Sequence, residues 1–164
     1  MAAGCVIAEM ADRVPVIVCS IAGGKLIGDR PEVLVPWWSI TKTCLAACAL
    51  VLVAGGRLDL DGPIAGRSFT LRQLLQHTSG PPCYTEHPDY DPALDRHDDP
   101  WTDEIVLAQA ESARLLFEPG HGWSYSNTGY LLVRRLIEQT TSLDVEQALP
   151  SLAQLFPWVT PRSF

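Results

Sequence analysis

The strongest constraint on this chain is an uninterrupted apolar run of eleven residues, 44–54. The run is well short of the roughly 20 residues that a helix needs to cross a bilayer. It predicts a helix that is apolar on every side and therefore lies inside the protein. Thr41 or Thr43 is placed to cap its start, and Gly55 and Gly56 end it, because glycine readily takes the conformation that follows a helix. The fold must enclose this helix.

The composition is that of one soluble, packed domain. The chain has 164 residues, of which 47% are hydrophobic and 19% are charged, and both fractions are typical of globular proteins. A chain of this length buries enough surface to need neither a disulfide nor a metal to hold its core. Its five cysteines include no CxxC pair, so they predict neither a zinc site nor a complete disulfide framework.

Negative charge is concentrated in one segment. The formal net charge is −7, and eight acidic residues lie between Glu86 and Glu104, where Arg96 is the only lysine or arginine. No basic face is left for a phosphate backbone, so we expect no nucleic-acid partner. Apolar stretches near the N-terminus are interrupted by charged residues and follow no cationic region. We therefore expect no signal peptide, which favours a cytoplasmic location.

The order of predicted elements gives an α/β (α+β) class. Residues 14–21 are apolar and β-branched, turn residues follow, and the apolar pattern resumes at 26–27, which together predict an N-terminal hairpin of a sheet. Thr70 opens a short helix, and residues 101–116 have helical spacing. Asn127 or Thr128 caps a last helix with an apolar stripe, and a long acidic loop spans residues 81–100.

We predict a single domain over residues 1–164. Within it, residues 14–56 hold the sheet hairpin and the buried helix, residues 57–149 form a mainly helical lobe, and residues 150–164 are an atypical tail. No internal repeat or low-complexity tract divides the chain. The predicted architecture is a small sheet beside a mainly helical insert.

Ser39 and Lys42 form an SxxK motif at the start of the buried helix. The i, i+3 spacing places the hydroxyl and the amine on one helical face. A serine hydroxyl is a weak nucleophile unless a neighbour takes its proton or stabilises the alkoxide, and Lys42 can do either. Desolvation by the apolar run lowers the pKa of a lysine toward that of a base, and the helix N-terminus favours an alkoxide on Ser39. A helix cap followed by a solvated lysine is the alternative interpretation.

Tyr125 and Asn127 form a second candidate motif. In an extended stretch, residues two apart point the same way, so the phenol and the amide lie on one side. A phenol near a lysine is biased toward phenolate and can act as a general base, while the amide can hold a substrate carbonyl or orient the lysine. A half-buried aromatic and a helix cap are the simpler interpretations, and the cap is compatible with a site role.

Four blocks carry a family resemblance: WSITKT at 38–43, GRLDLD at 56–61, LLQHTSG at 74–80, and PG with WSYSNTGYLL within 119–132. In order and spacing they resemble the class C beta-lactamase and D-alanyl-D-alanine peptidase group of penicillin-recognising serine hydrolases. The resemblance implies a beta-lactamase-like fold and an acyl-enzyme mechanism, without a cofactor, on a β-lactam, a D-amino peptide or an ester. It implies Ser39 as nucleophile, Lys42 as its activator, Tyr125 as general base or acid and Asn127 as partner of substrate and lysine. Residues 77–80 are structural in that group.

Departures from the family pattern predict an incomplete fold. Members are usually much longer and return to the sheet with further strands, one of which carries a Lys-Thr-Gly or His-x-Gly motif, whereas this chain has no lysine after Lys42. That strand supplies an oxyanion N–H donor, whose loss can cost about 10²–10³ in rate. We therefore expect missing C-terminal strands and self-association through an open sheet edge. A second hypothesis is an impaired remnant that acts as a binding or assembly module.

A third hypothesis is a metal site in the acidic segment, where histidine and carboxylate side chains gather at His87, Asp89, Asp91, His97, Asp98 and Asp99. Such side chains are common metal ligands. The segment has neither HxxxH nor EF-hand spacing, so a solvated acidic loop is the favoured interpretation. The sequence thus predicts a small-molecule or peptide substrate, no membrane span and no metal.

Overall fold

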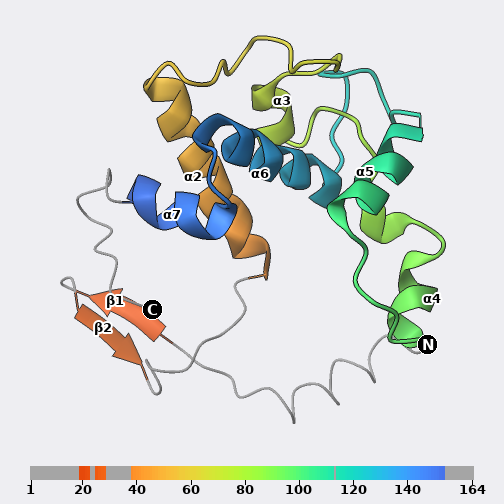
Figure 1. Ribbon diagram of the computed structural model, residues 1–164, viewed down its shortest axis with the longest axis horizontal. Helices are drawn as coiled ribbons and strands as arrows, with labels where there is room; N and C mark the ends of the chain where they lie inside the picture. Colours follow the sequence, from red (N-terminus) through yellow and green to blue (C-terminus); the bar gives the residue numbers. More distant parts are fainter. Residues whose placement is uncertain (1–18, 23–24, 29–37, 113, 154–164) are drawn as a thin grey trace. The chain divides into compact units, whose positions relative to one another are not determined.

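The computed structural model describes residues 19–22, 25–28, 38–112 and 114–153 of the chain (Figure 1). The chain divides into two units, Met1–Trp37 and Trp38–Phe164. The boundaries expected from the sequence, at residues 14–56, 57–149 and 150–164, stay a prediction. Within the described residues, no helix has both the length and the apolarity that crossing a membrane requires.

The first unit contains a short antiparallel pair of strands. Strand β1 (Cys19–Ala22) pairs with β2 (Lys25–Gly28), with Cys19 opposite Gly28 and Ala22 opposite Lys25. These strands lie where the apolar pattern and its turn were found, while residues 14–18 of the predicted first strand fall outside the described residues. A larger sheet built on this pair stays a prediction.

The second unit is a helical assembly around α2 and α6. A 3-10 turn, η1 (Trp38–Ile40), leads into α2 (Thr41–Ala54), which packs against α6 (Asn127–Thr141) and α7 (Val145–Ala153), while α3 (Leu71–Leu75) packs on α6. Figure 1 shows α6 crossing α2, with α7 close to both. Apolar side chains from these helices and their connections form one buried core: Leu45, Cys48, Ala49, Leu52, Phe69, Leu71, Leu74, Tyr130, Val133, Ile137 and Ala148.

The apolar run forms α2, but the helix begins differently from the expectation. Gly55 caps its end with a backbone N–H that donates to the Val51 carbonyl at 2.9 Å. At the start, the N-cap is Ile40 and no side chain makes a capping hydrogen bond. The predicted cap at Thr41 or Thr43 is therefore wrong, because η1 continues directly into the first turn of α2.

Side-chain caps fix the starts of α3 and α6. The Gln73 backbone N–H donates to Thr70 Oγ1 at 3.3 Å, and the Thr70 N–H donates to Gln73 Oε1 at 2.9 Å, which makes a capping box. At α6 the cap is Ser126, whose Oγ accepts a backbone N–H of the first turn at 3.1 Å. The predicted cap at Asn127 or Thr128 is wrong, and the Asn127 side chain is left for another contact.

The acidic segment contains more helix than the loop predicted over residues 81–100. It holds a second 3-10 turn, η2 (Tyr84–Glu86), and α4 (Tyr90–Asp95). Pro92 lies near the start of α4, where its missing N–H breaks no helical hydrogen bond. The next helix, α5 (Asp103–Ser112), is shorter than the one expected from the spacing.

Leu52 and Leu50 of α2 provide a matched test of this core, because Leu52 is 2% exposed and Leu50 is 46% exposed. We predict that Leu52→Ala lowers the free energy of unfolding by about 2–5 kcal/mol, since it removes buried surface and leaves a cavity. Leu50→Ala should lower it by about 1 kcal/mol or less. Urea unfolding followed by circular dichroism measures both values. Equal losses in the two variants would contradict the placement of α2.

Candidate active site

The turn before α2 places Ser39. Trp38, at the start of η1, has a left-handed φ of 47° and an 80% exposed side chain, and such a backbone is uncommon for a residue other than glycine. Ser39 follows it, exposed, at the entrance to α2. Because no side chain caps this helix, its positive end can stabilise negative charge that develops on Ser39.

Ser39 and Tyr125 are joined by a hydrogen bond. Their hydroxyl oxygens are 2.7 Å apart, which is the usual separation for an O–H···O bond. Tyr125 comes from the segment directly before α6, far from Ser39 in the sequence, and its side chain is partly exposed. The contact is within the range in which one hydroxyl can take the proton of the other.

Lys42 lies beside the same pair. Its Nζ donates to Asn127 Oδ1 at 2.6 Å and lies 5.0 Å from the centre of the Tyr125 ring and 5.7 Å from that of Tyr130. At these separations the ammonium is attracted to the faces of both rings. Asn127 is free for this contact because Ser126 caps α6 in its place. The structure thus brings together the four side chains that the two sequence motifs singled out.

The pKa of Tyr125 lies below its ordinary value. Partial burial acts to raise it, but hydrogen bonding to Lys42 and to Ser39, together with the positive charge of Lys42, outweighs burial. A lower pKa increases the fraction of phenolate near neutral pH. The phenol oxygen is therefore suited to accept the proton of Ser39.

His77 is a site residue for which the sequence motif implied only a structural role. Its ring centre lies 4.7 Å from that of Tyr125 and 5.1 Å from that of Tyr130. Its Nδ1 accepts the Ser126 backbone N–H at 3.1 Å, and its carbonyl oxygen accepts the Ser124 N–H at 3.1 Å. His77 therefore holds the segment that carries Tyr125 from both sides of that residue.

His77 is held neutral. Burial lowers its pKa from the ordinary value, and the positive charge of Lys42 lowers it further. A neutral ring is what the contact with Ser126 requires, because Nδ1 then accepts and Nε2 carries the proton. One signal was available in the sequence. A histidine follows α3 where glycine or asparagine is usual, and its φ of 59° is left-handed there.

Cys83 makes a second contact that the sequence patterns did not reveal. Its side chain is buried, and its Sγ accepts the Asn127 backbone N–H at 3.2 Å and lies 3.0 Å from Thr85 Oγ1. Beside it, the Tyr84 N–H donates to Thr128 Oγ1 at 3.0 Å. Residues at the start of η2 thereby fix the first residues of α6, and with them the position of Asn127.

The described residues of the acidic segment do not form the metal site of the third hypothesis. Within the part of the chain that the structure describes, no group of three or more histidine, cysteine, aspartate or glutamate side chains is placed to hold a metal ion. Asp98 instead binds Arg96 at 2.6 Å, and His87 lies 3.9 Å from Asp89. The contact between Arg96 and Asp98 is an ordinary exposed ion pair, which contributes little to stability.

The whole described site lies in a region that one family model recognises. The sequence model of the Beta-lactamase family matches residues 5–150. The chain belongs to the Beta-lactamase family. This result confirms the family resemblance of the sequence blocks and the beta-lactamase-like fold class.

Three relatives of this Beta-lactamase family chain illustrate the match. Penicillin-binding protein 4* of Bacillus subtilis (strain 168) is 39% identical over 78 residues, which are 47% of this chain and 17% of that protein. The D-stereospecific amidohydrolase from Streptomyces sp. is 36% identical with a TM-score of 0.61, over 69% of this chain and 39% of that chain. The octameric penicillin-binding protein homologue from Pyrococcus abyssi is 26% identical with a TM-score of 0.68, over 92% of this chain and 42% of that chain. This chain spans less than half the length of each.

The contact between Lys42 and Tyr125 predicts a change in titration. Lys42→Met removes the positive charge that lowers the pKa of Tyr125, so this pKa should rise toward or above its ordinary value. Ultraviolet difference titration, with Tyr125→Phe as the reference, measures it without any substrate. Arg72→Met is the matched control, because Arg72 pairs with the exposed Asp61 instead. A Tyr125 pKa that is unchanged in Lys42→Met would refute the proposed electrostatic coupling.

The neutral state of His77 predicts a pH dependence of stability. Because its pKa is lowered in the folded chain, the unfolded chain binds more protons below about pH 6.5, and the stability that neutral His77 contributes is present above that pH and lost as the pH falls. His77→Phe keeps a ring but loses the Ser126 contact, which should cost about 1 kcal/mol near pH 7. It should also lose less stability than the parent chain on acidification. Urea unfolding at about pH 5 and about pH 7.5 measures both effects, and parallel pH profiles would argue against a neutral His77.

Proposed function

We propose that this member of the Beta-lactamase family is a serine hydrolase that forms an acyl-enzyme on Ser39 with a β-lactam, a D-amino peptide or an ester. The observation that carries the proposal is the 2.7 Å hydrogen bond between the hydroxyls of Ser39 and Tyr125, with Lys42 beside it. The alternative interpretation of the SxxK motif, a helix cap followed by a solvated lysine, does not account for the bond from Lys42 to Asn127. It also leaves the lowered pKa of Tyr125 without a role.

In the proposed acylation, the Tyr125 phenolate takes the Ser39 proton while Ser39 Oγ attacks the carbonyl carbon of the substrate. A tetrahedral oxyanion forms. Its collapse breaks the C–N or C–O bond, and the Tyr125 hydroxyl gives its proton to the leaving amine or alkoxide. In deacylation the phenolate takes a proton from water, the resulting hydroxide attacks the ester carbonyl, and the proton passes to Ser39 Oγ as the acid product leaves.

Lys42 acts in this scheme as a fixed positive charge. The sequence left open whether Lys42 itself is the base, and the hydrogen bond of Ser39 to Tyr125 favours the phenol in that role. Asn127 Oδ1 accepts from the ammonium and keeps it beside the phenol, which leaves the Asn127 amide N–H groups for a substrate oxygen. The backbone N–H of Ser39, in the η1 turn that leads into α2, serves as an oxyanion donor.

The relatives support the proposed reaction class. The Streptomyces protein is a D-stereospecific amidohydrolase, and the Bacillus subtilis relative is a penicillin-binding protein. Both names are consistent with a substrate that carries an amide or a lactam. The Pyrococcus abyssi homologue is octameric, which favours self-association of this chain as well. The route predicted from the sequence, an open sheet edge, remains part of the proposal.

A covalent probe tests the nucleophile. We predict that a fluorophosphonate or penicillin probe adds one acyl or phosphonyl mass to the chain, that peptide mapping places it on Ser39, and that Ser39→Ala abolishes it. Tyr125→Phe should slow labelling by about 10²-fold or more, because the general base is lost. Ser68→Ala, at an exposed serine elsewhere in the chain, is the control and should label as the parent does.

Two outcomes would overturn the assignment. Labelling that persists in Ser39→Ala, or that maps to Ser79 or Ser126, would show that another group reacts. A chain that binds a penicillin reversibly but never acquires its mass would favour the second hypothesis, a remnant that serves as a binding or assembly module. Intact mass spectrometry together with a binding isotherm distinguishes these cases.

A further inference from the structure

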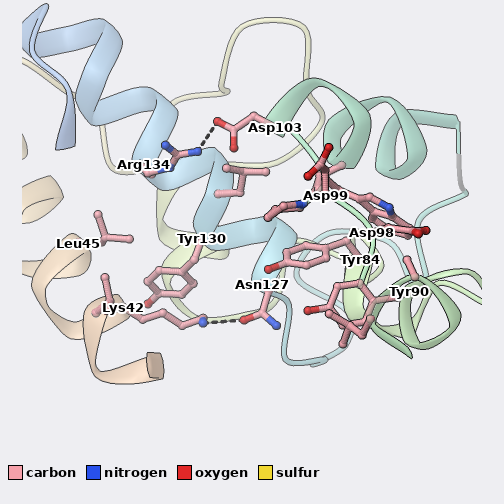
Figure 2. Close-up of a pocket in the computed structure, with 17 residues that line it drawn as sticks. Lys42, Leu45, Tyr84, Tyr90, Asp98, Asp99, Asp103, Asn127, Tyr130 and Arg134 are labelled. Atoms are coloured by element: carbon pink, nitrogen blue, oxygen red, sulfur yellow. Dashed lines mark hydrogen bonds and ion pairs between the residues drawn. The ribbon is translucent and has the colours of Figure 1, made fainter. Parts of the chain in front are cut away.

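A pocket of about 430 Å³ adjoins the candidate active site. Lys42 and Asn127 line one end of it, and Leu45 of α2 and Tyr130 of α6 line the adjoining wall (Figure 2). This volume is in the range of small-molecule binding sites. A group that enters the pocket is therefore next to the ammonium and the amide that lie beside Ser39 and Tyr125.

Aromatic side chains form a large part of the pocket wall. The ring centres of Tyr84 and Tyr90 are 5.6 Å apart at an interplanar angle of 68°, and those of Tyr90 and Trp101 are 5.6 Å apart at 76°. These edge-to-face contacts fix the rings against each other. Val106, which is buried in the first turn of α5, adds an aliphatic surface. Such a wall favours a flat, apolar guest.

The charges in the pocket lining favour a cation. Its carboxylates are Asp98, Asp99 and Asp103, against the two cations Lys42 and Arg134. Arg134 forms an ion pair with Asp103, and Lys42 donates a hydrogen bond to Asn127. Asp99 has no ion-pair partner within the described residues. Figure 2 shows Asp98 and Asp99 away from Lys42, beyond the tyrosine rings. An anionic guest would meet unpaired negative charge there.

We propose that this pocket holds the acyl side of the substrate and selects an aromatic group that carries a free ammonium, such as a phenylalanyl group. The inference rests on the proposed function, because the selected group is the one joined to the carbonyl that Ser39 attacks. Aromatic faces and carboxylates both attract a cation, while the ring of the guest fills the space between Leu45 and Trp101. An acyl group with a carboxylate is the one this lining rejects.

A matched series of esters tests the selectivity. The substrates are the methyl esters of D-phenylalanine, N-acetyl-D-phenylalanine, N-succinyl-D-phenylalanine and D-alanine. We expect kcat/KM for D-phenylalanine to exceed that for the N-acetyl ester by on the order of tenfold and to exceed that for D-alanine. The succinyl ester should be the poorest of the aromatic set. Equal values for the free, acetylated and succinylated esters would overturn the proposal.

Variants assign the selectivity to the pocket. Asp99→Asn should reduce the preference for the ammonium over the N-acetyl ester by about two- to fivefold, as expected for an exposed charge. Asp95→Asn is the matched control, because Asp95 is an exposed acid of α4 outside the pocket lining. Trp101→Leu should reduce the preference for phenylalanine over alanine. Equal effects of Asp99→Asn and Asp95→Asn would refute the role of the pocket.

A binding measurement separates this inference from the proposed function. Saturation-transfer NMR on the Ser39→Ala chain compares 2-phenylethylamine with 3-phenylpropanoate, which have the same ring and opposite charge. If Ser39→Ala binds the amine, Asp99→Asn weakens that binding, and the parent chain hydrolyses none of the esters, the pocket is retained and the hydrolase is rejected. Ester hydrolysis without any preference, and without amine binding, would retain the hydrolase and reject the pocket.

Discussion

The packing of α2 against α6 is the interaction on which the described site depends. Apolar side chains such as Leu52 and Val133 hold the two helices together in one core. Lys42 in the first turn of α2 and Asn127 at the start of α6 then meet at 2.6 Å. One such hydrogen bond contributes only about 1 kcal/mol net, whereas several buried aliphatic side chains contribute about 1.5–3 kcal/mol each. Apolar burial therefore places the polar groups, and the polar groups do not have to hold the fold.

The segment before α6 needs a different kind of support, because it is neither helix nor strand. His77 holds it through the backbone N–H groups of Ser124 and Ser126, and Cys83 holds the N–H of Asn127. These backbone bonds leave the side chains of Tyr125 and Asn127 free to contact Ser39 and Lys42. Groups fixed in this way before substrate arrives do not have to be reorganised during reaction, and this preorganisation is a large part of catalytic power in enzymes.

Local patterns predicted the parts of this arrangement that depend on neighbours in sequence. The apolar run specified α2, Thr70 marked the start of α3, and the spacing of Ser39 with Lys42 and of Tyr125 with Asn127 marked the candidate site. The cap of α6 was missed, because Ser126, Asn127 and Thr128 are all good N-cap residues. Tertiary contacts settle the choice among them, because Lys42 binds the Asn127 side chain and the Tyr84 N–H donates to the Thr128 hydroxyl.

The neutral state of His77 and the aromatic pocket depend wholly on tertiary contacts. Nothing in the sequence around His77 shows that its ring lies between Tyr125 and Tyr130 or that Lys42 is close enough to lower its pKa. The rings of Tyr84, Tyr90 and Trp101 belong to a segment whose composition indicates a solvated acidic loop. Only the fold of that segment places its aromatic residues on one side, toward Lys42 and Asn127.

The reactivity of the Cys83 thiol also reports on the local stability of the site. It is 4% exposed and is bound by the Asn127 N–H, so a thiol reagent reaches it only while the start of α6 separates from η2. The rate of its modification therefore reports how often the segment that carries Asn127 opens locally. Such local opening costs less free energy than global unfolding. A molecule that binds in the pocket beside Lys42 and Asn127 lowers the rate of Cys83 modification, whether or not it is a substrate.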